Sequence, residues 1–206
     1  MNEKEARFPI NFAPMPTKYV QSSLKRLLDI LFCLGILPIA VPLVVIFGLL
    51  VKLTSKGPVF YSQTRTGLNN LPFTICKMRT LVHGTQDPLA GMKKGDNSMV
   101  PFGAFLRQSR IDELPQIWNI LRGEMSWIGP RPEQTALVAV AQTQNADFSL
   151  RHSVRPGITG LAQVTNPNAT PDQNLEKLVK DLEYIQTASL EMDLSILFRS
   201  AFAVFR

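Results

Sequence analysis

A long apolar run near the start of the chain limits its possible folds more than any other feature. Residues 30–51, ILFCLGILPIAVPLVVIFGLLV, contain no charged side chain. Roughly 22 such residues are enough for a helix to cross the hydrocarbon core of a bilayer. The chain of 206 residues has room for one compact domain in addition to this segment.

Two prolines and the flanking charges argue against a simple crossing. Pro38 and Pro42 lie in the middle of the run, where each removes a backbone hydrogen bond and its ring clashes with the preceding turn, so we expect a break there. Because positive residues mark the cytoplasmic side of a membrane, a crossing helix would place one of the two flanking basic clusters on the wrong side. These clusters are Lys18, Lys25 and Arg26 before the run, and Lys52, Lys56 and Arg65 after it.

These observations predict a re-entrant helix-break-helix over residues 25–53, which enters one leaflet and returns. Each arm of about 12 residues would reach roughly 18 Å, about half a bilayer. A single crossing helix and a buried core helix remain the alternatives. Residues 1–24 form the expected N-terminal arm; they carry prolines and glutamates but no apolar run, so we expect a loose arm and not a signal peptide. Residues 54–206 are the expected cytoplasmic catalytic domain.

The remaining chain alternates short strand-like runs with helical patterns. Runs at residues 57–67 and 72–80 flank the turn GLNN and predict a hairpin, and residues 81–100 predict a loop. Residues 102–123 have apolar side chains at helical spacing and Gly123 at the end, which predicts a helix; the apolar positions are Leu114, Ile117, Trp118 and Leu121. A second amphipathic helix fits residues 171–186. The apolar tail, residues 194–206, fits an interfacial helix or a packed closing helix equally well.

The expected fold class is therefore α+β and mainly helical. We expect an N-terminal re-entrant membrane segment packed on a small cytoplasmic domain, which has a short β-hairpin and amphipathic interfacial helices. A zinc site or a disulfide framework is not expected, because the chain has only Cys33, Cys76, His83 and His152 to build one, without a CxxC motif.

The formal net charge of +6 favours an anionic partner, which could be nucleic acid, anionic lipid or a phosphorylated small molecule. Nucleic acid is not expected, because the chain has no aromatic-basic RNA motif and such a function would leave the apolar segment unexplained. Membrane lipid and a phosphorylated substrate remain.

An acidic pair, Asp112-Glu113, stands among arginines in the segment SRIDELPQIWNILRGEMSWIGPRPE. Acidic residues also cap helices, so the pair alone favours capping. The surrounding cations favour a phosphate site instead, since carboxylates can hold a divalent ion, guanidinium groups bind phosphate oxygens, and a carboxylate can attack phosphorus. These cations are Arg107, Arg110, Arg131 in GPRP and Arg155 in VRPGITG.

Taken in order, the apolar segment, KMRT, FLRQSRIDELPQIWNILRGEMSWIGPRPE and VRPGITGLAQV resemble the bacterial sugar transferases, specifically the small monotopic phosphoglycosyl transferases. The resemblance runs from about Lys25 to near the C-terminus. It implies transfer of a phosphosugar from a UDP-sugar to undecaprenyl phosphate, with release of UMP, at the cytoplasmic face of the bacterial inner membrane. It also implies that Asp112 is the nucleophile, that Glu113 is its partner, and that both bind Mg²⁺.

The same resemblance implies substrate-binding roles for further polar residues. These are Lys77, Arg107, Arg131 and Gln163 around the phosphates, and Asp181 and Tyr184 in the late stretch KDLEYIQ, in addition to Arg155. The chain departs from the family pattern at Val41-Pro42 with the extra Pro38, at GDNSMVPFG (95–103) and at TNPNATPDQ (165–173). The sugar, the pathway and the oligomeric state therefore stay open, and a homo-oligomer is one of the open alternatives.

A second class of function competes with the enzyme. A membrane-attached scaffold could use the basic face to bind anionic lipid without catalysis. Such a scaffold has no need of Asp112. Release of UMP from a UDP-sugar separates the two.

Overall fold

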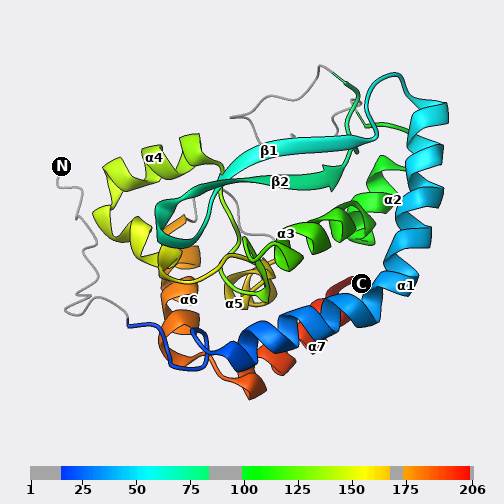
Figure 1. Cartoon of the computed structure of the whole chain (residues 1–206). Coiled ribbons are helices and arrows are strands. Elements are labelled where there is room, and N and C mark those ends of the chain that lie inside the picture. The colour runs from blue at the N-terminus through cyan, green and yellow to red at the C-terminus, as the bar shows by residue number, and fades with distance from the viewer. Residues whose placement is uncertain (1–14, 84–98, 168–173, 205–206) are drawn as a thin grey trace.

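The computed structural model describes residues 15–83, 99–167 and 174–204 (Figure 1). The predicted loop at residues 81–100 falls largely outside them. In chain order the elements are α1 (Ser23–Thr54), β1 (Phe60–Thr66), η1 (Leu68–Asn70), β2 (Pro72–Met78), α2 (Gly103–Gln108), η2 (Ile111–Gln116), α3 (Ile117–Leu121), β3 (Ser126–Ile128), α4 (Thr135–Gln144), η3 (Ala146–Ser153), β4 (Gly157–Thr159), α5 (Leu161–Thr165), α6 (Asn174–Thr187) and α7 (Leu190–Val204).

The predicted hairpin is confirmed. β1 and β2 pair antiparallel, with Phe60 opposite Met78 and Thr66 opposite Pro72. Asn69 and Asn70 make the turn at φ values of 54° and 61°, in the left-handed region that asparagine tolerates well. Farther along the chain, β3 and β4 form a short parallel pair. With these two small sheets among many helices, the α+β, mainly helical class is also confirmed.

The apolar segment forms one long helix without the predicted break. α1 stays helical through Pro38 and Pro42, and its length and apolar composition are sufficient to cross a membrane. Figure 1 shows that it is nevertheless bent, because its first half and its second half point in different directions. Proline inside a helix removes one hydrogen bond and crowds the preceding turn, which is the usual cause of such a bend.

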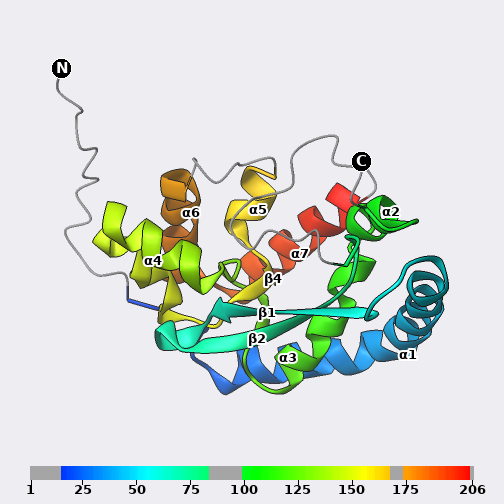
Figure 2. The ribbon, with the colours of Figure 1, turned by 90° about the horizontal axis from the view of Figure 1, so that it is seen from above.

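One stripe of α1 packs on the rest of the protein on both sides of the bend. Cys33 and Ala40 join Ile117 and Ile120 of α3 and Ile75 of β2 in one buried cluster, and Figures 1 and 2 show α3 lying between α1 and the hairpin. Near the end of the helix, Val51 packs in a further small cluster. Contact along the whole stripe explains why the helix continues through its prolines.

Two guanidinium groups tie the ends of α1 to the domain. Arg26 donates to the carbonyl oxygens of Ile120 and Leu121, at 2.6 and 2.9 Å, at the end of α3. Arg79, which follows β2, donates to the carbonyl oxygens of Pro58 at 2.6 Å and Lys56 at 2.8 Å, just beyond α1. Both ends of the apolar helix therefore contact the same domain.

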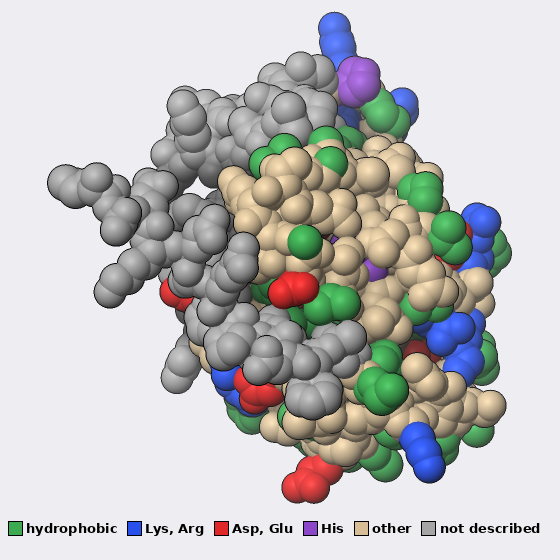
Figure 3. Space-filling view, turned by 90° about the vertical axis from the view of Figure 1, so that its left-hand side faces the viewer, with side chains coloured by type: hydrophobic (Ala, Val, Ile, Leu, Met, Phe, Trp, Pro, Cys, Tyr) green, Lys and Arg blue, Asp and Glu red, His purple; other side chains and the backbone are tan. Residues whose placement is uncertain are grey.

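The other sides of α1 expose large apolar side chains. These are Leu24, Leu27, Leu31, Phe32, Leu34, Ile39, Val41, Val45, Ile46, Leu49 and Leu53. Figure 3 views the side opposite the second half of α1, and there the hydrophobic side chains stand scattered among polar ones. An exposed apolar surface of this extent marks a contact with lipid or protein.

The predicted single helix over residues 102–123 is wrong. α2 ends before Arg110, which has a φ of 60°, and the next turn, η2, is a 3-10 helix that contains Pro115. Only then does the short α3 follow, and Gly123, at a φ of 83°, ends it as expected. Trp118, counted with the apolar positions of that helix, is 62% exposed.

The C-terminal helices form a second core. The predicted amphipathic helix is confirmed as α6, which buries Leu178, Leu182 and Ile185. α7 buries Ile196 in the same cluster but exposes a face with Leu194, Phe198 and Phe202. The tail is thus a packed helix, and its exposed apolar face is one that an interfacial helix would present.

The described part of the N-terminal arm is packed rather than loose. The amide of Thr17 donates to the carbonyl oxygen of Ile185 at 3.1 Å, and its hydroxyl donates to that of Ala188 at 3.0 Å. The arm therefore lies against the end of α6 before α1 begins.

Candidate active site

The acidic pair lies in a tight 3-10 turn that turns both carboxylates inward. Asp112 is 7% exposed and Glu113 is 4% exposed. The N-cap position of η2 is Arg110, whose left-handed backbone turns the chain into this short helix. The interpretation of the pair as a helix cap is therefore wrong, and the burial of both charges requires another explanation.

Glu113 is the acceptor for three cations from three parts of the chain. Lys77 Nζ lies 2.7 Å from Oε1, and Arg131 Nη2 lies 2.8 Å from the same oxygen. Arg110 Nη1 lies 3.3 Å from Oε2. We call these four residues the Glu113 cluster. It joins β2, the segment before η2 and the GPRP loop at one carboxylate.

The charges of the Glu113 cluster change the acidity of its members. Burial alone would raise the pKa of the Glu113 carboxyl, but the positive charges of Arg131, Lys77 and Arg110 outweigh it and hold that pKa well below its usual range. Burial lowers the pKa of Lys77, as does the charge of Arg131, while Glu113 and Asp112 oppose this change. Glu113 is thus a fixed anion that keeps these cations together.

Asp112 differs from its neighbour in both bonding and acidity. Its Oδ1 is buried and has no hydrogen-bond partner within residues 15–83, 99–167 and 174–204. Burial, and then the charge of Glu113, raise the pKa of Asp112 to about 6, although the charges of Lys77, Arg107 and Arg131 lower it. A buried carboxylate oxygen without a partner is available to a ligand, a metal ion or a reacting atom.

Arg107 lies near the acidic pair, and Gln163 lies beside Arg131. Burial lowers the pKa of Arg107, although the charges of Asp112 and Glu113 oppose this change. Arg107 Nε donates to Thr80 Oγ1 at 2.7 Å. Gln163 and Arg131 both donate to the carbonyl oxygen of Ile158, at 3.4 and 3.5 Å, so their side chains are neighbours. The structure therefore brings together Lys77, Arg107, Asp112, Glu113 and Arg131. Gln163 joins them only through its neighbour Arg131.

Three other predicted site residues lie in separate contacts. Arg155 Nε donates to the carbonyl oxygen of Gly123 at 2.9 Å, at the end of α3. Asp181 is paired with the buried Arg151 at 2.6 Å. The Tyr184 hydroxyl lies 2.8 Å from Asp193 Oδ1, in another buried cluster. These contacts are structural and do not bring the three side chains to Asp112.

Asn119 and Arg151 support the site but were not predicted from the sequence. Asn119 Nδ2 donates to the carbonyl oxygen of Thr74 at 2.7 Å and so fixes α3 on the strand that carries Lys77. Arg151 Nη2 donates to the carbonyl oxygen of Arg131 at 3.0 Å, which orients the GPRP loop. A buried asparagine on an apolar helix face was the available signal for the first; the second had no local signal.

The residues at the site fit Mg²⁺ through one carboxylate rather than two. Within the described parts of the chain, no group of three or more His, Cys, Asp or Glu side chains is arranged to hold a metal ion. Mg²⁺ usually keeps several waters and binds one or two carboxylates together with substrate phosphates. Asp112 offers an oxygen that has no partner in residues 15–83, 99–167 and 174–204, whereas both oxygens of Glu113 already accept from cations.

Comparison with known proteins places the chain in a family. The model of the family described as Bacterial sugar transferase matches residues 20–206. A UDP-glucose:undecaprenyl-phosphate glucose-1-phosphate transferase of Caulobacter vibrioides is 39% identical over 181 residues, which cover 85% of this chain and 67% of that protein. The chain therefore belongs to the bacterial sugar transferase family.

Two further relatives differ in length and in the sugar that they are named for. A UDP-N-acetylgalactosamine-undecaprenyl-phosphate N-acetylgalactosaminephosphotransferase of Aeromonas hydrophila is 38% identical over 88% of this chain, which spans only 43% of that protein. The exopolysaccharide production protein PSS of Rhizobium leguminosarum bv. phaseoli is 36% identical, over 85% of this chain and 92% of its own length. The chain thus spans less than half of some relatives and most of others.

Proposed function

We propose that this chain is a phosphoglycosyl transferase that moves a sugar 1-phosphate from a UDP-sugar to undecaprenyl phosphate and releases UMP, the first step of a polysaccharide or glycoconjugate. The observation that carries this proposal is the buried Asp112 Oδ1, which has no hydrogen-bond partner among the described residues and lies beside a cluster of cations. A nucleophile must keep an oxygen free, and an anionic donor needs cations close to it.

The reaction proceeds in two displacements at phosphorus. Asp112 attacks the phosphorus that bears the sugar, and an aspartyl oxygen–phosphorus bond forms. The bond from that phosphorus to the bridging oxygen breaks, and the bridging oxygen leaves as part of UMP. In the second displacement, a phosphate oxygen of undecaprenyl phosphate attacks the same phosphorus and Asp112 is released as a carboxylate. Dividing the transfer in this way matches the chemistry of carboxylate nucleophiles in phosphoryl transfer.

The cations reduce the repulsion between the carboxylate and the anionic donor. The Arg131 guanidinium lies at the junction of Glu113 and the VRPGITG segment, where it can bind phosphate oxygens in a bidentate manner. Lys77 and Arg107 add further positive charge near Asp112, since both lower the pKa of its carboxyl. Mg²⁺, held by Asp112 and the donor phosphates, would supply further neutralisation of the diphosphate. Glu113 keeps Lys77 and Arg131 in place.

Release of UMP is the test of this function. Purified protein with Mg²⁺ and a panel of UDP-sugars, without acceptor, should release up to one equivalent of UMP and gain the mass of one phosphosugar. Undecaprenyl phosphate should then discharge the adduct and allow turnover. Turnover that requires both substrates together, without an adduct, would exclude the covalent route. A lipid-binding scaffold would release no UMP with any donor.

We also propose that α1 is re-entrant at the cytoplasmic face of the bacterial inner membrane. Its two ends contact one domain through Arg26 and Arg79. The helix contains Pro38 and Pro42 and is bent. A straight helix of this length would extend about 48 Å and carry one end away from that domain. Cysteine labelling tests the topology. A tag at the N-terminus should react only from the cytoplasm, as Cys-substituted positions near Lys56 should; periplasmic labelling of the tag would mean a crossing helix.

A further inference from the structure

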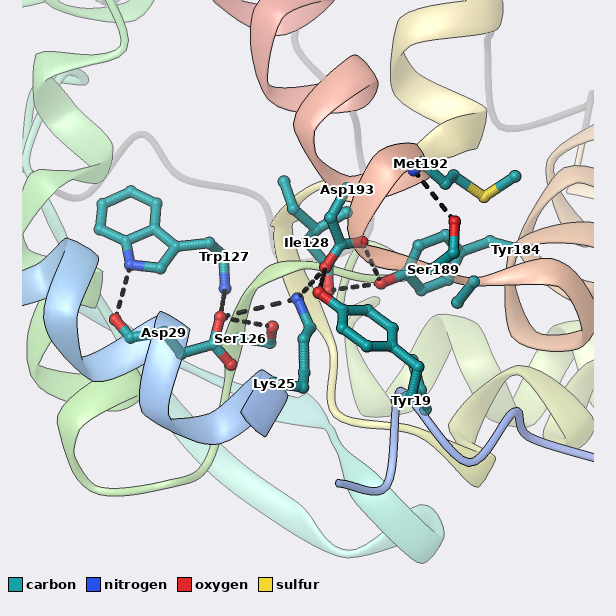
Figure 4. Close-up of polar contacts among 12 residues, drawn as sticks. Tyr19, Lys25, Asp29, Ser126, Trp127, Ile128, Tyr184, Ser189, Met192 and Asp193 are labelled. Atoms are coloured by element: carbon teal, nitrogen blue, oxygen red, sulfur yellow. Dashed lines mark hydrogen bonds and ion pairs between the residues drawn. The ribbon is translucent and has the colours of Figure 1, made fainter. Parts of the chain in front are cut away.

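β3 is the strand that leads into the GPRP loop, and within the described parts of the chain it has a strand neighbour on one edge only. On that edge it pairs with β4, and the amide of Ser126 donates to the carbonyl oxygen of Pro156 at 2.9 Å. On the other edge lies the start of α1 (Figure 4), where Asp29 Oδ1 accepts from the amide of Trp127 at 3.1 Å and from the Ser126 hydroxyl at 2.9 Å. Asp29 therefore takes the place of a neighbouring strand.

Trp127 and α1 are joined by two more contacts. The indole Nε1 of Trp127 donates to the backbone carbonyl oxygen of Asp29 at 3.2 Å. Its ring meets that of Phe32 edge to face, with 4.6 Å between the centroids. The strand is thus attached to the helix through backbone and side chain, and it cannot shift along α1 without breaking several contacts at once.

Asp29 is itself fixed by a buried ionic group at the junction of α1 and α7. Lys25 Nζ lies 3.6 Å from Asp29 Oδ1 and 2.6 Å from Asp193 Oδ2. The hydroxyls of Tyr19 and Tyr184 both point at Asp193, at 2.9 and 2.8 Å (Figure 4). We call Lys25, Asp29 and Asp193 the Lys25 cluster. Because all three are buried, the carboxylate of Asp29 has one defined position.

The segment between β3 and Arg131 has no room to absorb a displacement. A Cβ atom on Gly129 would lie 2.5 Å from the carbonyl oxygen of Arg155, and one on Gly160 would lie 2.2 Å from that of Gly129. Gly129 also donates to the carbonyl oxygen of Thr159 at 2.9 Å. Such close backbone packing transmits a shift of β3 to Arg131 rather than dissipating it.

We propose that Asp29 is a positioning residue for Arg131, so that the apolar helix α1 is part of the frame of the active site and not a tether alone. The inference rests on the proposed function, in which Arg131 binds the donor phosphates. Asp29 acts by fixing β3, and β3 fixes the GPRP loop that directly follows it, in which Arg131 is the third residue after Ile128. A displacement of about 1 Å at a binding group is enough to cost roughly a hundredfold in rate.

The test compares Asp29→Ala with Asp29→Asn in the full chain, in detergent or liposomes. Asp29→Ala should lower kcat/KM for UMP release by roughly tenfold to a hundredfold, because Trp127 and Ser126 lose their acceptor. Asp29→Asn keeps an oxygen for the Trp127 amide and should recover most of that loss. Leu31→Ala, an exposed position half a turn away on the same helix, is the matched control and should behave as the wild type.

A double-variant cycle separates positioning from a general loss of structure. In the Arg131→Gln background, Asp29→Ala should have little further effect on kcat/KM, because the group through which it acts has already been removed. An effect of Asp29→Ala that persists unchanged in that background would overturn the proposal. So would wild-type activity of Asp29→Ala.

Amide hydrogen exchange gives a readout that does not depend on activity. Asp29→Ala should speed exchange at Trp127 and Gly129 relative to Leu31→Ala, and unchanged protection there would contradict the inference. If Asp29→Ala does not fold, Trp127→Phe removes the indole donor and should act in the same direction, with the same suppression by Arg131→Gln. Absence of UMP release by the wild type would instead refute the proposed function. The exchange result would then still test whether Asp29 fixes β3.

Discussion

The Glu113 cluster and the Lys25 cluster differ in the balance of positive and negative charge and in how far their side chains are exposed to solvent. In the Glu113 cluster, Lys77, Arg110 and Arg131 share one carboxylate, and the side chains of Arg110 and Arg131 are 52% and 35% exposed. In the Lys25 cluster, one ammonium lies between two carboxylates, and each of these side chains is at most 8% exposed. The first group has cations in excess and an open side; the second has neither.

The difference separates a binding site from a scaffold. Cations that outnumber their carboxylates and reach solvent can bind an anionic ligand without prior loss of a protein contact. In the Lys25 cluster every charge is used within the protein, and Tyr19 and Tyr184 complete the bonding of Asp193. Buried carboxylates and ion pairs occur in both clusters and do not distinguish them. The balance of charge and the solvent exposure of the cations do.

The largest effect is expected at Asp112, which lies beside the Glu113 cluster. Asp112→Asn should reduce turnover by at least about a thousandfold and abolish the phosphosugar adduct, because an amide is a poor nucleophile of nearly the same shape. The same change should raise stability at pH 7 by up to about 3 kcal/mol, since burial raises the pKa of this carboxyl to about 6 and so penalises its charged form. UMP release, intact mass and denaturant unfolding measure the three outcomes. An active Asp112→Asn variant would mean that the Glu113 cluster is not the catalytic site, and its contrast with the Lys25 cluster would then have no functional meaning.

Glu113→Gln should destabilise the protein but strengthen its affinity for anions. Three cations would lose their shared carboxylate, at a cost of about 3–5 kcal/mol, and turnover should fall because Lys77 and Arg131 are no longer oriented. Pyrophosphate should then raise the thermal midpoint more than it does for the wild type, since it replaces the lost charge. Asp193→Asn is the matched control, and pyrophosphate should stabilise it no more than the wild type. Equal responses in both variants would contradict the assignment of the ligand site to the Glu113 cluster.

In the Lys25 cluster the expected behaviour is structural. Lys25→Met leaves Asp29 and Asp193 buried without their cation and should cost about 3 kcal/mol or more. Adding Asp193→Asn should restore part of this loss, with a coupling energy of about 1–3 kcal/mol in denaturant unfolding. The pyrophosphate affinity of the folded double variant should equal that of the wild type. A weakened affinity there would mean that the two clusters are not separate in function.

Features encoded locally could be predicted from the sequence. The hairpin has its signal in the GLNN turn and the runs beside it, and α6 has its signal in the spacing of its apolar residues. The local sequence could not show whether α1 breaks at its prolines, because packing of Cys33 and Ala40 against α3 decides whether the helix continues. Likewise, the left-handed Arg110 divides the helix predicted over residues 102–123, and the apolar spacing gave no sign of this.

The candidate site was predictable where motifs are contiguous and less so where contacts are distant. Asp112, Glu113 and Arg131 lie in one quoted segment, and the structure places them together. Tyr184 matches a family position, but its hydroxyl donates to Asp193 of the Lys25 cluster. Arg151 contacts the backbone of a residue 20 positions earlier, and nothing in its local sequence indicates that partner.

Arg151 and Asp181 form a third ionic group, and both side chains are buried. Adding a positive charge beside this pair tests whether a site without access to solvent can accept an excess of cations. His152 adjoins the pair; its Nδ1 lies 2.7 Å from Asn70 Oδ1, so it donates to that oxygen in the neutral form. Burial, and then the charge of Arg151, lower the pKa of His152 to about 4. The folded protein therefore binds fewer protons than the unfolded chain, and stability is lost as pH falls from about 6.5 to about 4.

The expected size of this loss is about 3 kcal/mol between pH 7 and pH 4, which the variant His152→Gln should not show. Gln offers an amide donor to Asn70 but has no proton to gain. Asp181 titrates in the opposite sense, because burial raises its pKa to about 6 and protonation there stabilises the folded state as pH falls. Subtracting the His152→Gln curve from the wild-type curve in denaturant unfolding cancels the Asp181 contribution and leaves that of His152. Parallel curves would mean that this closed site tolerates a second positive charge beside Arg151, and that exposure rather than charge balance separates the binding site from the scaffold.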